Sequence, residues 1–163
     1  MKTHIEFKSS AFPAYEGEDE EINPGRWGKR LAEFIKSQLE KENIGTEDIY
    51  SEDWGVAVPI KNEDFPIWIG CGNSEESKDG FLCFIEPSKP NIRHWFRKID
   101  TTSKVSRVSD ALDKILRSHP DIREVRWWSE NKTEANQSLE PTALLVTPRA
   151  FARVAPSSAV AHL

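Results

Sequence analysis

The chain lacks long apolar runs, is poor in cysteine and has no excess of positive charge. No stretch approaches the roughly 20 apolar residues that a membrane-spanning helix needs. The first twelve residues, MKTHIEFKSSAF, alternate polar and apolar side chains and lack the apolar core of a secretory signal. We therefore expect a cytoplasmic protein without a membrane partner, in which the two cysteines are reduced.

Metal-ligand spacings are also absent from the sequence. The four histidines lie far apart, and neither cysteine belongs to a Cys-x-x-Cys pair. Structural zinc sites bring such ligands together at short, fixed spacings. The sequence therefore predicts no metal site, and no motif in it indicates a cofactor.

The charge balance bears on the partners of the chain. The net charge is −5, and residues 130–163 hold three basic and three acidic side chains, so the whole excess lies in residues 1–129. Phosphate binding depends on clustered Lys and Arg. Residues 93–98, Arg-His-Trp-Phe-Arg-Lys, do mix basic and aromatic side chains as single-strand binders do. Helical spacing would turn Trp95 and Phe96 inward, however, so we predict no nucleic-acid partner.

The composition changes near Ser129. All six tryptophans precede it, whereas residues 130–163 hold seven of the twelve alanines. A body of about 129 residues can bury a core without disulfide or metal support. We predict a single domain over residues 1–129 and a C-terminal extension over residues 130–163.

The first part of the chain predicts a strand, a loop and a helix. In residues 4–8, Ile5 and Phe7 alternate with polar side chains, which is typical of a half-solvated strand. Five acids within residues 16–21 indicate a solvated loop. Asn23 and Pro24 have the residue types of a helix N-cap and first turn. An apolar stripe then runs at helical spacing through Trp27, Leu31, Phe34, Ile35 and Leu39.

Three strands are predicted next, over residues 53–60, 65–71 and 80–86. Alternation places Trp54 with the apolar residues of the first strand and Trp68 on the opposite face of the second. The links between the strands are short and polar, and the second ends in Asp79-Gly80. Such links are typical of antiparallel hairpins, so we expect a meander.

The remainder of the body predicts two helices and a strand. Ile92, Trp95, Phe96 and Ile99 have the spacing i, i+3, i+4, i+7 of a short helix. A second helical stripe runs over residues 105–119 and ends at Pro120, and residues 122–127 form a last strand. The predicted fold is α+β, a mainly antiparallel sheet in the order β-α-β-β-β-α-α-β with helices packed on one face.

The predicted sheet is apolar on both faces, because Trp68, Leu82 and Phe84 oppose the core-facing set. If helices cover one face, something else must cover the other. The candidates are a second subunit, the apolar residues 143–146 of the extension, or loops of the body itself. We favour a homo-oligomer.

Reactive side chains are few. Cys71 and Cys83 could face each other across adjacent strands, although two small buried hydrophobes suit a cytosolic chain better than a disulfide. The turn Gly70-Cys71-Gly72-Asn73 could expose a nucleophile, with His94 as its base. Most carboxylates lie in turns; Glu86 ends an apolar strand, where burial would favour its protonated form.

Two resemblances go further than these patterns. From about residue 135 the extension, with ANQSLEPTALLV and then PSSAVAHL, resembles the translated recombination site of a bacterial integron gene cassette. That resemblance implies a mobile, horizontally transferred gene. The body is similar to a family of uncharacterised bacterial proteins through INPGRWGKRLAEF, EDWGVAVPI, IWIGCGN, DGFLCFIEP, WFRKID and REVRWW. The family has no established activity, so the resemblance implies no functional residues.

The sequence thus favours a small non-catalytic binding or accessory module of a mobile cassette, acting on a protein or small molecule through an apolar sheet surface or an oligomer interface. No catalytic set is predicted. The alternative is an enzyme that uses carboxylates or Cys71 in a cleft. The candidate binding residues are Trp54, Trp68, Glu86, Arg93 and Arg97.

Overall fold

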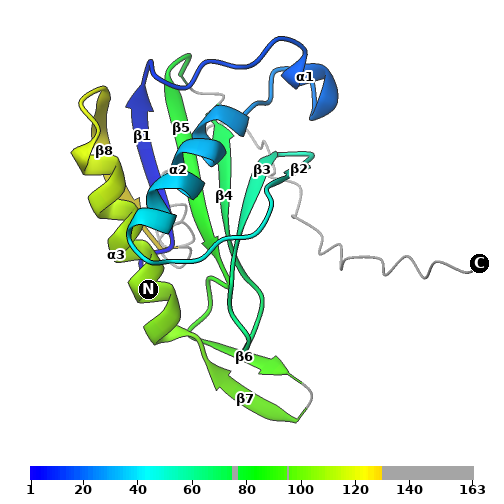
Figure 1. Cartoon of the computed structure of the whole chain (residues 1–163), viewed down its shortest axis with the longest axis vertical. Helices are drawn as coiled ribbons and strands as arrows, with labels where there is room; N and C mark the ends of the chain where they lie inside the picture. Colours follow the sequence, from blue (N-terminus) through cyan, green and yellow to red (C-terminus); the bar gives the residue numbers. More distant parts are fainter. Residues whose placement is uncertain (75–76, 95, 130–163) are drawn as a thin grey trace, which may run out of the picture.

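A six-stranded sheet forms the body of the protein, in a computed structural model that describes residues 1–74, 77–94 and 96–129 (Figure 1). Its strand order is β2-β3-β4-β5-β1-β8, and every neighbouring pair is antiparallel. Its strands are β1 (His4–Ser9), β2 (Tyr50–Glu52), β3 (Gly55–Ile60), β4 (Ile67–Asn73), β5 (Gly80–Glu86) and β8 (Ile122–Trp128). The first strand therefore lies between β5 and the last strand, as a central member of the sheet.

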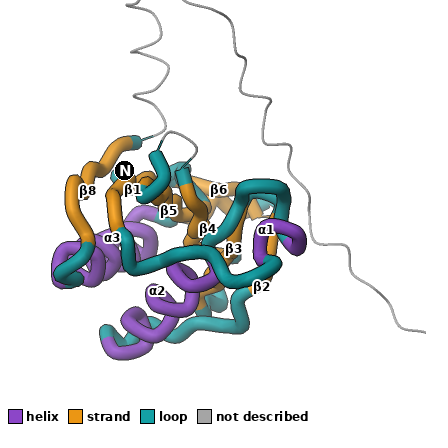
Figure 2. Tube along the Cα trace, turned by 90° about the horizontal axis from the view of Figure 1, so that it is seen from above, coloured by secondary structure: helices purple, strands orange, loops and turns teal. Residues whose placement is uncertain are grey.

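Two long helices pack on the same face of this sheet (Figure 2). They are α2 (Lys29–Lys41), which contacts β3 and β4, and α3 (Thr102–Ser118), which contacts β5 and β8. A one-turn helix, α1 (Glu18–Glu21), lies at one end of the molecule. The α+β class, the mainly antiparallel sheet and the packing of helices on one face are confirmed. None of the described helices is long and apolar enough to cross a membrane.

Strict alternation on the strands builds the core between sheet and helices. On β1, Ile5 and Phe7 are 0% and 2% exposed, whereas His4, Glu6 and Lys8, which alternate with them, are only partly buried. The same alternation places Ile69 and Cys71 of β4 on the helix side, where both are fully buried. Side chains of a strand point alternately to the two faces of its sheet. One face therefore carries the core side chains, and the other face carries a second set of side chains, which point away from the long helices.

The predicted helix over residues 92–99 is wrong. This segment forms a hairpin of β6 (Asn91–His94) and β7 (Arg97–Asp100), which makes a separate two-stranded sheet. Ile92 and Ile99 are directly opposite each other in it, and both pack against the core. A spacing of seven residues is consistent both with one helix face and with a cross-strand pair around a two-residue turn. Trp95 lies outside the described residues.

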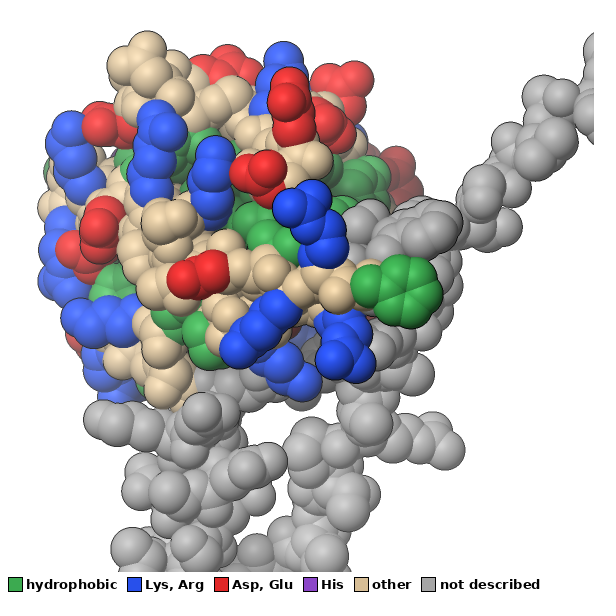
Figure 3. Space-filling model, turned by 90° about the horizontal axis from the view of Figure 1, so that it is seen from below, with side chains coloured by type: hydrophobic (Ala, Val, Ile, Leu, Met, Phe, Trp, Pro, Cys, Tyr) green, Lys and Arg blue, Asp and Glu red, His purple; other side chains and the backbone are tan. Residues whose placement is uncertain are grey.

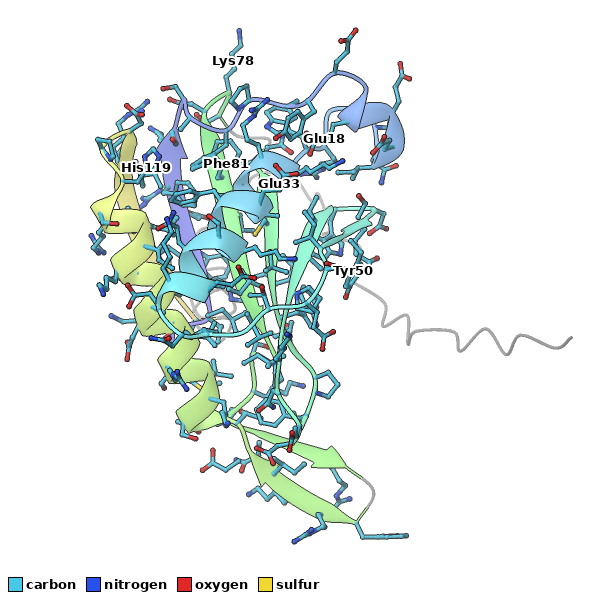
Figure 4. The ribbon with its side chains drawn as sticks, in the orientation of Figure 1. Glu18, Glu33, Tyr50, Lys78, Phe81 and His119 are labelled. Atoms are coloured by element: carbon cyan, nitrogen blue, oxygen red, sulfur yellow. The ribbon has the colours of Figure 1, made fainter. Side chains whose placement is uncertain are left out.

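The predicted start of the first long helix is also wrong. Residues 23 and 26 form an isolated bridge, and α2 begins only at Lys29, after Gly28. The acidic segment is not simply a solvated loop, because Glu18 is 2% exposed. One oxygen of its carboxylate accepts hydrogen bonds from the N–H groups of Gly28 (2.8 Å) and Lys29 (2.7 Å). A carboxylate from ten residues upstream therefore caps the helix, in place of Asn23 (Figure 4).

Candidate functional site

The face of the sheet away from the long helices carries one continuous row across all six strands. Directly paired residues lie on the same face of a sheet, and the register joins one residue from each strand in this way. The row is Tyr50, Ala57, Gly70, Phe84, His4 and Trp128. Four of these six side chains are aromatic rings.

Aromatic rings from distant parts of the chain contact one another on this face. His4 stacks on Trp128 with centroids 4.3 Å apart, and lies 5.9 Å from Phe84. Phe84 in turn contacts Trp54 at 4.9 Å and Trp68 at 5.4 Å, and the two tryptophans stack at 5.5 Å. We call these five residues, each half-buried, the aromatic face.

Gly70 allows the ring of Phe84 to pack at the centre of this face. A Cβ atom there would lie well under 3.0 Å from the ring of Phe84. The ring therefore lies directly over the glycine backbone of the neighbouring strand, where an aromatic ring can pack flat on the sheet. This contact brings Phe84 within reach of both tryptophans.

Charged side chains of both signs border the aromatic face. Glu6 and Arg126 are opposite each other on β1 and β8, with a 3.5 Å ion pair. Lys8 pairs with Glu124 at 2.8 Å, and this hydrogen bond lowers the pKa of the Glu124 carboxyl. These groups are solvent-exposed, so they contribute little to stability. The rim is neither purely basic nor purely acidic.

Three of the five predicted binding residues come together here. Trp68 is confirmed on the face opposite the core, and Glu86 is its direct partner on β5. The prediction that alternation places Trp54 with the core-facing side chains of its strand is wrong. Trp54 precedes β3, whose first residue, Gly55, has φ +153°, and its ring stacks on Trp68. The left-handed backbone at the glycine breaks the alternation on which the prediction depended.

Arg93 and Arg97 are not part of this group. They lie on the β6–β7 hairpin, at the end of the molecule opposite α1. The Glu86 carboxylate accepts a hydrogen bond from the Ser88 N–H at 2.9 Å, which fixes it at the end of β5. Sequence reasoning did not name His4 or Trp128 as site residues. The signal that could have found them was the antiparallel pairing of β1 with both β5 and β8, which no local pattern specifies.

The two cysteines lie opposite each other on β4 and β5, as the sequence allowed, and both thiols are free. Both are 0% exposed on the helix side of the sheet. Burial, together with the neighbouring Cys83 thiol, raises the pKa of Cys71 well above its usual value. A buried thiol with a raised pKa is a poor nucleophile, so the geometry does not support Cys71 as a catalytic group.

We expect neither thiol to react with an aromatic disulfide reagent in the native protein on the timescale of minutes, because both are fully buried and burial raises the pKa of Cys71. In denaturant, both should react at once. The measurement is the release of thiolate chromophore with and without denaturant. Rapid reaction of the folded chain would contradict the placement of Cys71 in the core.

Two hollows lie on the described part of the protein, and neither of these two is an enclosed pocket with converging catalytic groups. The larger, of about 480 Å³, lies beside Trp68 and is lined in part by Glu47, Glu63 and Asp64. The smaller, of about 120 Å³, contains Lys61, Lys104 and Arg107. Among the described residues, no group of three or more His, Cys, Asp or Glu side chains could hold a metal ion. Glu75 and Glu76 lie outside those residues.

The fold and the aromatic face define a small antiparallel α+β domain whose sheet carries aromatic side chains on the side away from its helices. No known protein family matches this chain, and no curated protein or solved structure is significantly similar to it.

Proposed function

We propose that this protein is a non-catalytic binding module that associates with a second copy of itself through the aromatic face. The observation that carries the proposal is the cluster of five half-buried rings on the side of the sheet away from both long helices. Trp and other aromatic side chains are enriched at the centres of protein interfaces, where they supply most of the binding energy.

The size and charge of the surface support a second copy as the occupant. Six strands at the usual spacing are about 24 Å across, which with their length gives an area of the order that one partner contributes to a standard interface. A two-fold interface must be complementary to itself. The mixed rim, with Glu6, Lys8, Glu124 and Arg126, offers each charge an opposite partner on the second copy.

The C-terminal extension is the competing occupant of the same face. Its apolar residues 143–146 lie outside the described residues, as does the whole of 130–163. The extension begins two residues after Trp128, one of the five rings. We also propose that the protein is an accessory of a mobile gene cassette. The support for this role is the resemblance of the extension to a translated recombination site.

Light scattering on the full chain and on a chain ending at Ser129 tests the association. We expect both to be dimers, because the described sheet and helices lie within residues 1–129. Trp68→Glu should weaken the dimer by about 30-fold or more, since it places a charge among stacked rings. Circular dichroism checks that the variant remains folded.

Phe96→Ala is the matched control, because it removes an exposed aromatic ring on the hairpin, away from the aromatic face. It should leave the dimer unchanged. A monomeric full chain with a dimeric truncated chain would show that the extension covers the face. If both chains are monomers at high concentration, the proposal is wrong.

A further inference from the structure

The β6–β7 hairpin projects from the end of the molecule that is opposite α1 (Figure 1). Its base is firmly attached. Ile92 and Ile99 pack against the core, and Thr101, where α3 begins, donates a backbone hydrogen bond to the Pro90 carbonyl at 3.1 Å. The hairpin is therefore a projection whose base is attached to the core of the domain and whose outer part is exposed to solvent.

The hairpin is basic, although the protein is acidic. Residues 87–100 contain four basic side chains and one acidic one, while the whole chain has a net charge of −5. The remaining residues are therefore more acidic than the chain as a whole. Viewed from the hairpin end, Lys and Arg side chains lie together along one edge of the visible surface, while both signs of charge are mixed over the rest of it (Figure 3).

Two of the basic side chains are directly opposed. Arg93 pairs with Lys98 across the hairpin, and both are exposed. Like charges directly opposite each other on a sheet are destabilising. Among the described residues, no ion pair joins Arg93, Arg97 or Lys98 to a carboxylate. Asp100, the one acid in residues 87–100, accepts a hydrogen bond from the Thr102 N–H at 2.8 Å, and hydrogen bonding to Thr102, with a smaller contribution from Lys98, lowers the pKa of its carboxyl. An anion between the two strands would remove the repulsion.

The turn of the hairpin carries an aromatic ring where turn-forming residues are expected. The two residues between β6 and β7 are Trp95 and Phe96, whereas such turns favour Gly, Asn and Asp. Phe96 is 97% exposed. This fully exposed phenylalanine contributes nothing to the core of the domain, and at the tip of a basic projection its ring is free to stack on a planar group.

We propose that this hairpin binds a nucleic-acid strand, with Arg93 and Lys98, which share one face of the hairpin, on the phosphates and Phe96 stacked on a base. Basic side chains that follow the backbone and an aromatic ring that stacks on bases are the two components of such binding.

A second group of basic side chains lies around the beginning of α3, the helix that follows the hairpin in the chain. Lys104 and Arg107 there, with Lys61 from the end of β3, line the smaller hollow, which contains no acidic side chain. These residues extend the phosphate-binding surface past the base of the hairpin. The sequence predicts no nucleic-acid partner partly because a helix would turn Phe96 inward. In the hairpin Phe96 is exposed, so this reason no longer applies.

An anionic membrane fits these observations less well. Membrane binding grows with the apolar area that is inserted, and the described part of the hairpin presents one exposed apolar side chain among several charged ones. Nucleic-acid binding uses both kinds of group. The inference concerns a different surface from the aromatic face and does not depend on the proposed self-association.

Fluorescence anisotropy with a labelled mixed-sequence DNA oligonucleotide, as a single strand and as its duplex, tests the proposal on the full chain. At about 50 mM salt we expect binding to at least one form, weakening steeply as salt rises. Arg93→Ala with Lys98→Ala should lower the salt slope by about 2. Phe96→Ala should weaken binding by about tenfold at every salt concentration, and Phe96→Trp should restore it.

Lys2→Ala with Lys78→Ala is the control of equal charge, because both lysines are exposed and lie outside the hairpin; Lys78 is at the opposite end of the molecule (Figure 4). It should leave the affinity nearly unchanged. The proposal is overturned if neither form of DNA binds, or if the control weakens binding as much as the hairpin variants do. Hairpin-dependent binding to phosphatidylserine vesicles alone would overturn it in favour of a membrane.

Discussion

Glu18→Ala is expected to lower the free energy of unfolding by about 3 kcal/mol, which is a large effect for a residue in an acidic surface segment. The carboxylate is 2% exposed and accepts three backbone hydrogen bonds, from Tyr15, Gly28 and Lys29. Removing it leaves these N–H groups without their partner at a place where water has little access. It also removes a negative charge from the positive end of the α2 dipole.

Denaturant unfolding followed by circular dichroism measures this loss. Glu20→Ala is the matched control, because this carboxylate belongs to the same short helix but is exposed. It should change the stability by no more than about 0.5 kcal/mol. Equal effects of the two substitutions would show that Glu18 does not cap α2.

Gly28→Ala should destabilise the protein by a similar amount, about 3 kcal/mol. A Cβ atom at this position would lie well under 3.0 Å from the carbonyl oxygen of Cys71. That carbonyl belongs to the main chain of β4 in the middle of the core, so it cannot move aside as a flexible side chain could. The helix start would have to lift from the strand, and the Glu18 cap would be disturbed with it.

Thermal unfolding compares this variant with Gly45→Ala. The Cβ added at Gly45 would meet the flexible side chain of Lys61 at 3.2 Å, and the backbone there is not left-handed. We expect its stability to change by less than about 1 kcal/mol. If Gly28→Ala is as mild as this control, the close approach of α2 to β4 is incorrect.

The start of α2 shows why local residue types alone predict the wrong first residue for this helix. Asn23 and Pro24 have the right types for a helix start, but the chain from there to Gly28 is tied to the end of β4. Asn73 is the residue that holds it. The Asn73 side chain accepts a hydrogen bond from the Trp27 N–H at 3.0 Å and donates one to the Gly25 carbonyl at 2.9 Å. These contacts, 46 and 48 residues apart in sequence, are unavailable to any local pattern.

The last strand gives a second example. The predicted last strand is present, and its apolar residues Ile122, Val125 and Trp127 pack against the core, although their spacing is not strictly alternate. A bulge in the pairing with β1 accommodates the extra residue, at the point where Glu124 has φ +56°. The apolar residues identify the strand, but only the pairing with β1 decides where the bulge lies.

The aromatic face was predictable in part. Alternation placed Trp68 and Phe84 on the side away from the core, and that placement is confirmed by their ring contacts. The inclusion of His4 and Trp128 was not predictable, because it depends on β1 entering the sheet between β5 and β8. The hairpin was missed for a different reason: the spacing of Ile92 and Ile99 satisfies a helix and a two-residue turn equally well.

The sequence by itself determined the α+β class, the antiparallel meander, the second long helix and most of the side chains that form the core. Each of these follows from local periodicity, since burial selects apolar residues at the repeat of the element. The tertiary structure decided where α2 begins, that residues 91–100 pair as strands and which rings meet on the aromatic face. These features depend on contacts between residues far apart in the chain, and such contacts leave no repeat in the sequence.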